Sequence, residues 1–158
     1  QIRRQAYWAL LGGACGHFMG NTPLWIFSAG WEDQLSSPAS RAMTHLRSLF
    51  DAYPWWDLIP DNDHVLVVGG IGEFTGMDYC GAAKTADGTL AMAYVPVPRT
   101  ITLDMTRMAD RRFRVHWFDP ITGEHTPSTP HQASGRWGFT PPWDHDAVLV
   151  IEAEPATS

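Results

Sequence analysis

The stretch AAKTADGTLAMAYV, residues 82–95, decides how the second half of the chain folds. Its Asp87-Gly88 dipeptide is a strong signal for a hairpin turn. A short apolar run precedes the dipeptide, and a longer one follows it over residues 90–95, as is typical of paired strands. The stretch therefore predicts an antiparallel β-hairpin.

The same pattern continues on both sides of this hairpin. Short runs rich in β-branched and aromatic residues lie at 65–68, 91–95, 100–103, 114–118 and 147–152. Residues 119–123, DPITG, form a second turn of the Pro-then-Gly kind. Strands and turns at this spacing over about ninety residues indicate an antiparallel β-sandwich. We place it at residues 62–154, with 155–158 as a tail.

The first sixty residues have a helical pattern instead. Residues 3–12 carry apolar side chains at helical spacing and end at a Gly-Gly pair. Ala14–Met19 is too short for a helix and is predicted as a buried strand. Ser37 is a suitable N-cap for a second helix, whose apolar positions repeat at three and four until Pro54. We therefore expect a helix, a strand and a helix before a domain boundary at residues 60–62.

Composition excludes several classes of protein. The chain has 158 residues, 44% of them hydrophobic and 18% charged, which is typical of a globular protein and of neither a disordered nor a membrane-spanning chain. A net charge of −6 without a basic run argues against nucleic acid as a partner. The two cysteines, Cys15 and Cys80, are expected as free buried thiols. The sequence opens on Gln1 without a signal peptide, so we expect it to be part of something longer.

No catalytic pair of acids is evident. Glycosidic hydrolysis needs two carboxyl groups on facing elements, but Glu32 and Asp33 are neighbours in sequence and Glu73 stands alone between glycines. The glycines at 69–72 lack the third glycine and the helix of a dinucleotide loop. The seven histidines show no zinc-ligand spacing. We therefore predict no metal, no cofactor and no catalytic residue within this chain.

Four residues are candidates for binding a ligand. His17 and Asn21 follow the predicted strand, where barrel enzymes collect polar groups, although both could equally be structural hydrogen bonders. Trp25 and Trp31 lie in a stretch, residues 25–34, whose mixed composition suits a loop. Their indole rings could stack on sugar faces or could simply pack the loop. Both interpretations stay open on the residues alone.

Several motifs of the chain resemble those of a known family. The string RQAYWALLGGACGH at residues 4–17, Asn21 to Trp25, the LIPD of 58–61 and the WFDP of 117–120 resemble the C-terminal half of apiosidase-like glycoside hydrolases. Met19 departs from the family, which usually has Tyr there. The resemblance covers essentially the whole chain.

The resemblance implies a fold and a role. It implies that residues 1–60 are the last helix, strand and helix of a (β/α)₈ barrel, and that residues 62–154 are a small β-sandwich often labelled collagen-binding. It places His17 and Trp25 at a sugar site, and the catalytic carboxylates on earlier strands that have no counterpart here. We therefore expect this chain alone to be inactive, and its helices to expose an apolar face formed by Tyr7, Leu10, Met43 and Leu46.

Two hypotheses follow for the function. The first is the C-terminal portion of a retaining O-glycosidase that acts on plant or microbial glycans, with His17, Asn21, Trp25 and Trp31 contributing to the sugar pocket. Its partners would be a carbohydrate and, as a separate chain, the N-terminal barrel portion, with an extracellular or periplasmic location implied by the resemblance. The second is a free-standing module that binds polysaccharide or collagen through Trp137 and Trp143.

Overall fold

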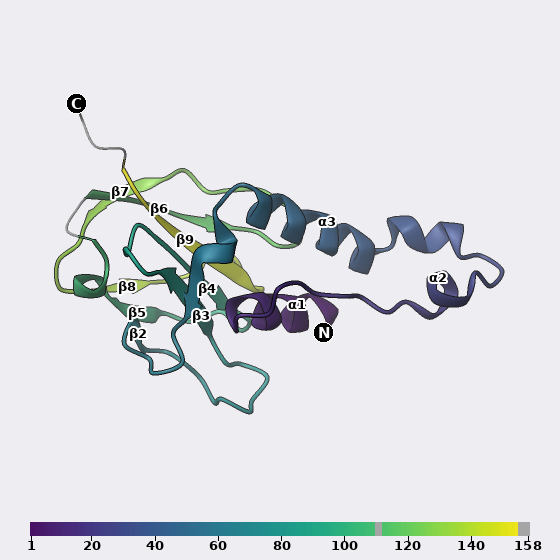
Figure 1. Ribbon diagram of the computed structural model, residues 1–158, viewed down its shortest axis with the longest axis horizontal. Helices are drawn as coiled ribbons and strands as arrows, with labels where there is room; N and C mark the ends of the chain where they lie inside the picture. Colours follow the sequence, from purple (N-terminus) through teal and green to yellow (C-terminus); the bar gives the residue numbers. More distant parts are fainter. Residues whose placement is uncertain (110–111, 155–158) are drawn as a thin grey trace.

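The computed structural model describes residues 1–109 and 112–154, so the predicted tail at 155–158 lies outside the described residues. Two sheets form one end of an elongated molecule, and helices extend from them toward the other end (Figure 1). The sheets hold nine strands within the described residues: β1 (Leu58–Pro60), β2 (Val67–Gly69), β3 (Gly81–Thr85), β4 (Leu90–Val95), β5 (Ile101–Asp104), β6 (Arg112–Phe118), β7 (Thr129–Gln132), β8 (Arg136–Phe139) and β9 (Ala147–Ala153).

The strands form the predicted antiparallel sandwich. One sheet has six strands in the order β1-β3-β4-β9-β6-β7, the other has three in the order β2-β5-β8, and the neighbouring strands of both sheets run antiparallel. Apolar side chains from the inner faces of both sheets make one core, with Phe113, Leu103 and Leu149 at its centre. Burial on alternate positions of β5 shows why: one face of the strand meets the core and the other meets solvent.

The hairpin at residues 82–95 is confirmed. Strands β3 and β4 pair with Lys84 opposite Ala91, and Gly88 at the turn has a φ of 69°. Asp87 fixes the turn, because its carboxylate accepts hydrogen bonds from the Thr85 hydroxyl at 2.6 Å and from the Thr89 backbone N–H at 3.0 Å. The strongest local signal in the sequence therefore produces the local structure that it predicts.

Both predicted helices are present. The first, α1 (Ile2–Leu11), ends at Gly12, and the second, α3 (Pro38–Asp51), begins after Ser37, whose hydroxyl accepts the Ser40 backbone N–H at 3.3 Å. A short helix α2 (Thr22–Ile26) and a 3₁₀ turn η1 (Glu32–Ser36) lie between them. The stretch predicted as loop at residues 25–34 is therefore partly helical.

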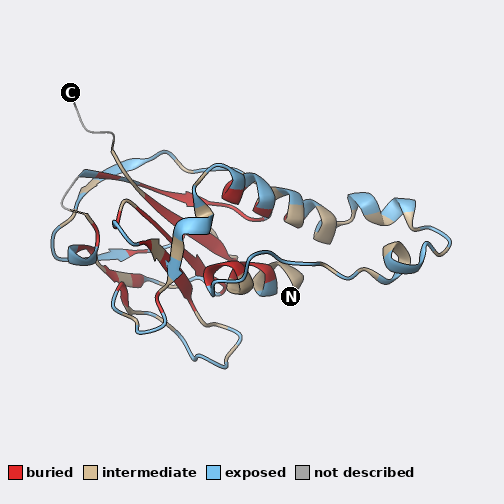
Figure 2. Cartoon of the chain, in the orientation of Figure 1, coloured by how far each residue is buried: buried red, intermediate tan, exposed pale blue. Residues whose placement is uncertain are grey.

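The helices do not expose the apolar face that we expected. Tyr7, Leu10 and Leu46 are buried and Met43 is half-buried, because α1 and α3 pack on the outer face of the six-stranded sheet. The Tyr7 ring stacks on Tyr94 of β4 with 4.7 Å between ring centroids. The expectation was wrong because the sandwich itself supplies the surface that covers the two helices (Figure 2).

An ion pair fastens α1 to the sandwich. Arg3 at the start of the helix donates two hydrogen bonds to Asp146, one from Nε at 2.7 Å, and the Tyr94 hydroxyl donates a third at 2.7 Å. Burial alone would raise the pKa of Asp146, but the hydrogen bonds from Arg3 and Tyr94 outweigh it and hold that pKa below its usual range. The charged Asp146 carboxylate accepts all three hydrogen bonds and therefore links α1 to the residue just before β9.

The predicted strand at Ala14–Met19 is absent. These residues are extended but unpaired, and the described part of the chain contains no strand beside them. An extended segment becomes a strand only when a neighbour supplies its hydrogen bonds, so the apolar run by itself was insufficient.

No helix among the described residues is long and apolar enough to span a membrane.

Candidate functional site

Residues 12–37 project from the body of the protein as an arm. The chain leaves α1 in an extended conformation, forms α2 at the far end, and returns through η1 to the start of α3 (Figure 1). Not one residue of this arm is buried, in contrast to the red core of the sheets and the inner faces of the helices in Figure 2. The arm is therefore folded locally, and it touches the start of α3 through η1 but contributes no residue to either core.

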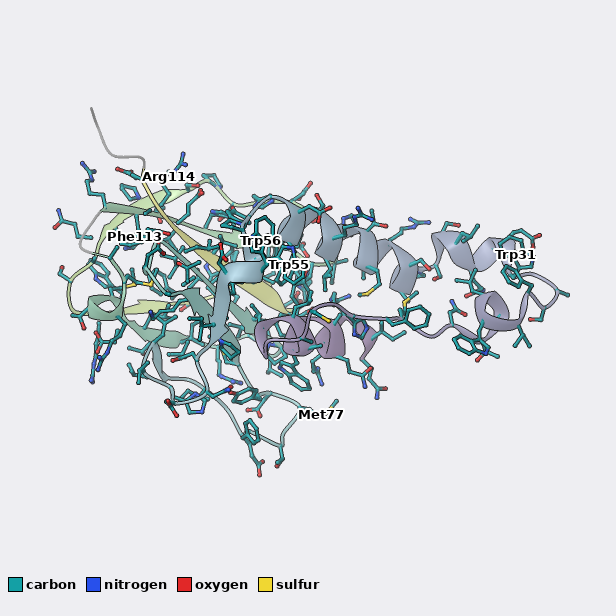
Figure 3. The ribbon with its side chains drawn as sticks, in the orientation of Figure 1. Trp31, Trp55, Trp56, Met77, Phe113 and Arg114 are labelled. Atoms are coloured by element: carbon teal, nitrogen blue, oxygen red, sulfur yellow. The ribbon has the colours of Figure 1, made fainter. Side chains whose placement is uncertain are left out.

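All four predicted binding residues lie on this arm. His17 is exposed on the extended stretch, and Asn21 precedes α2 without capping it through its side chain. Trp25 is 68% exposed, and the half-buried Trp31 lies near the outer end of the arm, far from Trp55 and Trp56 at its root (Figure 3). The structure thus brings the four residues onto one element, without enclosing them in a pocket.

The aromatic side chains of the arm form two separate pairs. Phe18 meets Trp25 edge to face with 6.3 Å between ring centroids, and Phe27 meets Trp31 in the same way at 5.2 Å. Phe18 and Phe27 are themselves 79% and 71% exposed. So much apolar surface on one protruding element is unusual for a surface that meets only water.

One stretch of the arm has no backbone hydrogen-bond partner within the described part of the chain. Among the described residues, none from 15 to 20 takes part in a backbone hydrogen bond, although the segment is extended. An unpaired extended segment presents a row of donors and acceptors that neighbouring strands can use. Residues 15–20 therefore leave their backbone donors and acceptors open, on the same arm as the exposed apolar side chains.

The acids of the chain do not form a catalytic pair. Glu32 and Asp33 share the single turn η1 at the outer part of the arm, while Glu73 is exposed on the loop of residues 70–80. Among the described residues, no group of three His, Cys, Asp or Glu side chains lies close enough to hold a metal ion.

The cysteines are both unpaired. Cys80 is buried as expected, and burial raises the pKa of its thiol to about 12. Cys15 is exposed at the root of the arm, so the expectation that both thiols are buried was wrong for this one. It lines a cleft of about 220 Å³ together with Trp55, Trp56 and Leu58 and does not enter the core.

A cleft that the sequence did not predict lies beside α1. It has a volume of about 330 Å³ and is lined by Trp8, Phe74 and Tyr79, among others. The Trp8 indole N–H donates to the Tyr79 carbonyl at 2.8 Å. The signal for this cleft in the sequence is an aromatic residue, Phe74, between Gly72 and Gly76. It follows the glycines of residues 69–72, which match a nucleotide-binding motif only in part.

One arginine holds the loop that forms this cleft. Arg99 donates from Nε to the Gly70 carbonyl at 2.5 Å and from Nη2 to the carbonyls of Ile71 and Asp78, and its Nη1 lies 3.2 Å from the Asp78 carboxylate. These hydrogen bonds hold both ends of the loop, and Phe74 is exposed between them. Met77 lies at the protruding end of the same loop (Figure 3).

Of the two tryptophans predicted to bind a ligand in a binding module, one is exposed on the sandwich. Trp137 of β8 is 40% exposed, whereas Trp143 is half-buried against the sandwich core. Beside Trp137 lies a cleft of about 200 Å³, at the opposite end of the molecule from α2 (Figure 1). The arm, the cleft at α1 and this cleft are thus three separate surfaces.

The chain resembles known proteins over its whole length. Residues 59–152 match the family described as "Putative collagen-binding domain of a collagenase", and residues 1–57 match the family described as "Apiosidase-like, catalytic domain". No curated protein matches the chain. The first of these matches covers more than half of the residues.

Two solved structures share the fold. One, described as a glycoside hydrolase, has a TM-score of 0.84 at 22% identity and is matched over 97% of this chain and 36% of its own. The other, a glycoside hydrolase family 5 protein from Bacteroides vulgatus, has a TM-score of 0.84 at 20% identity over 96% and 35%. This chain spans about a third of the length of either structure. It belongs to the family of the collagen-binding-type domain, and its residues 1–57 match the apiosidase-like catalytic domain.

Proposed function

We propose that this chain is the C-terminal portion of a glycoside hydrolase. In this proposal residues 1–60 complete a (β/α)₈ barrel, the sandwich at 62–154 follows it, and the catalytic carboxylates belong to a preceding portion of the barrel. The matches to the apiosidase-like catalytic domain and to two glycoside hydrolase structures support it. An extracellular or periplasmic location, which rests on the family resemblance alone, is part of the same proposal.

The arm is the observation that carries this proposal. Its extended residues 15–20 have no backbone partner among the described residues, and its side chains Phe18, Trp25 and Phe27 are exposed. A barrel strand pairs with a strand on each side, and its flanking loops meet other loops at the carboxyl end of the barrel. Pairing with barrel strands would satisfy the backbone and cover the aromatic rings at once.

The predicted residues then take specific roles. In this proposal residues 15–20 pair as a barrel strand, and Asn21 and Trp25 follow it at the carboxyl end, where barrel enzymes bind substrate. The Trp25 indole offers a broad apolar face for a sugar ring, and His17 and Asn21 offer donors and acceptors for hydroxyl groups. Trp31 would close the outer side of the same pocket, since η1 places it beyond α2 along the arm.

The proposal also gives the body of the chain a purpose. Arg3–Asp146 and the Tyr7–Tyr94 stack fix α1 to the six-stranded sheet, so the sandwich serves as a rigid base for the arm. A catalytic group must be held close to its productive geometry, and rigid supporting elements provide this. In this proposal the sandwich holds α1 in place and so positions the barrel residues on the arm that follows it.

The mass of the protein in its natural source tests the proposal. Antibodies against this chain should recover either a polypeptide larger than 17.6 kDa or a complex that contains a second chain, and the recovered material should hydrolyse aryl glycosides. A single compact species of 17.6 kDa without glycosidase activity would refute it. The comparison of native and denaturing conditions distinguishes a longer chain from a separate partner.

Two tryptophan variants of the same enzyme, produced recombinantly, test the site. Trp25→Ala should lower kcat/KM on the same substrates by at least about tenfold if the ring contacts sugar. Trp56→Ala, at an exposed tryptophan near the root of the arm, is the matched control and should leave kcat/KM unchanged. Equal losses in the two variants would argue for a general effect on folding.

A further inference from the structure

The cleft beside Trp137 is formed where the edges of the two sheets meet. Strand β7 is the edge of the six-stranded sheet and β8 is an edge of the three-stranded sheet. The cleft is lined by Arg112, Pro130, His131, Gln132 and Trp137, and has a volume of about 200 Å³. Clefts for drug-sized ligands start near 300 Å³, so this one suits a single small ring.

The aromatic wall of the cleft is held in place. The Trp137 indole N–H donates to the Ser134 carbonyl at 2.7 Å, so the ring cannot turn without losing that bond. The His131 ring packs against Trp137 at 88° with 5.1 Å between centroids, and also against Phe139 at 5.3 Å. A fixed indole that stays 40% exposed offers a flat apolar surface at little entropic cost.

A buried acceptor lies beside this wall. The Thr129 hydroxyl donates to the Val115 carbonyl at 3.3 Å, which leaves His131 Nε2–H to donate to the Thr129 oxygen at 3.1 Å. Burial lowers the pKa of His131, so its ring is neutral at pH 7 and Nδ1 carries a free lone pair. Nδ1 is buried and has no partner in the structure. The His131 ring is therefore fixed by Thr129 as well as by its contacts with Trp137 and Phe139.

The rim of the cleft adds further polar groups with nearly balanced charge. Arg112 and Gln132 are directly opposite each other in the β6–β7 pairing and reach the rim from adjacent strands. The Arg112 guanidinium lies 3.7 Å from the Glu154 carboxylate, and Arg136 of β8 lies 3.9 Å from Asp104. Because these cations have acidic partners, the rim favours a neutral ligand over a strongly charged one.

We propose that this cleft binds one sugar ring of a neutral glycan. The ring would stack its C–H face on Trp137 and form hydrogen bonds through its hydroxyl groups to Gln132 and Arg112. Strands β7 and β8, which carry most of the cleft lining, lie at the end of the molecule opposite α2 and the arm (Figure 1). The site therefore stands independently of the barrel function proposed above.

Electrophoresis of the purified chain through gels that contain polysaccharide tests this site. Separate gels hold mixed-linkage β-glucan, xyloglucan, arabinoxylan, galactomannan or the acidic polygalacturonate, and sedimentation with fibrillar collagen is run in parallel. We expect retardation by at least one neutral glycan. Binding to polygalacturonate alone, binding to collagen alone, or no binding to any neutral glycan would each overturn the proposal.

Variants at the cleft sharpen the result. Trp137→Ala should weaken binding at least about tenfold, and Trp137→Phe should recover part of it because an aromatic face remains. Gln132→Ala, at an exposed position, should weaken binding several-fold and guards against a misfolded Trp137 variant.

Trp56→Ala, at a tryptophan that is 70% exposed and lies outside the cleft, is the matched control. It should bind the glycan as tightly as the original chain does. Loss of binding in Trp25→Ala but not in Trp137→Ala would move the sugar site to the arm and refute the proposal for the cleft.

Discussion

Two regions of the same helical segment differ sharply in how they are packed. In α1 and the second half of α3, Tyr7, Leu11, Leu49 and Phe50 are almost fully buried against the six-stranded sheet. In the arm at residues 12–37, which lies between those helices in sequence, no residue is buried. Both regions belong to the match with the apiosidase-like catalytic domain. The difference shows that the sandwich covers α1 and the second half of α3 and does not cover the arm.

Removal of a buried ring should have the largest effect on this contrast. Phe50 is 3% exposed and contacts the rings of Tyr7 and Trp55. Phe50→Ala should lower the free energy of unfolding by about 4 kcal/mol, because it leaves a cavity between α3 and the sheet. Phe27→Ala on the arm should change it by less than about 0.5 kcal/mol. Urea denaturation of both variants gives the comparison, and similar losses would mean that the arm is packed in solution.

The ion pair at the start of α1 should come next. Asp146→Ala removes the partner of Arg3 and Tyr94 and should cost about 3 kcal/mol, since it strands a partly buried guanidinium. Asp51→Ala breaks the exposed Arg47–Asp51 pair and should cost less than about 0.5 kcal/mol.

The same ion pair predicts a pH dependence at acid pH. The pKa of Asp146 is held below its usual range, so its contribution is complete above about pH 4 and is lost as the pH falls further. Denaturation curves at neutral pH and between pH 2 and about 4 measure both effects. A loss at neutral pH no larger than that of Asp51→Ala would contradict a fastening role for the pair.

A buried histidine should make the body of the protein sensitive to mild acid. His116 of β6 is 5% exposed and lies 3.5 Å from the Tyr53 hydroxyl, at the end of α3. Burial, reinforced by the charges of His125 and Arg114, lowers the pKa of His116 to about 4. Between pH 6.5 and about 4 the unfolded chain therefore binds a proton that the folded chain does not, and stability falls by at most about 3 kcal/mol.

Replacement of this histidine checks the assignment. His116→Leu should flatten the dependence of unfolding free energy on pH in that window, as measured by urea denaturation at several pH values. His17→Leu, at the exposed histidine of the arm, is the control and should keep the original slope. An unchanged slope in His116→Leu would show that other groups carry the acid sensitivity.

Polar replacements on the arm should have the smallest effect on stability. The double change Phe18→Ser and Phe27→Ser removes two exposed rings and should alter the free energy of unfolding by less than about 0.5 kcal/mol. It should nevertheless reduce the binding of a fluorescent hydrophobic dye, because those rings form part of an exposed apolar surface. Dye titration of the two proteins tests this, and equal dye binding would mean that other surfaces dominate.

Several parts of the fold could be predicted because their causes are local. Asp87-Gly88 specifies a turn whatever surrounds it, and the Ser37 cap with Pro38 specifies the start of α3. The strands β4, β5, β6 and β9 were found within one or two residues of their bounds, because their apolar runs are continuous or alternate. β7 and β8 were missed, since Pro130 and Gly138 weaken the strand pattern and pairing with β6 and β5 overrides it.

The candidate site divides in the same way. The resemblance and the residue types selected His17, Asn21, Trp25 and Trp31, and their common place on one arm follows from closeness in sequence. The cleft at Trp137 could not be predicted, because Thr129, His131 and Trp137 come together only through the edges of two different sheets. The cleft at Trp8 likewise depends on Arg99, which lies far in sequence from the loop that it holds.

By itself, the sequence determined the turns, the caps, the two helices, the antiparallel strands of the sandwich and the family resemblance, because each depends on residues close together in the chain. Only the tertiary structure decided that α1 and α3 are covered by the sandwich, that Ala14–Met19 has no strand partner, and that a neutral histidine stands beside an exposed indole. The physical reason is that burial and hydrogen-bond pairing depend on what lies across from a segment, and the pattern of one segment does not specify its neighbour.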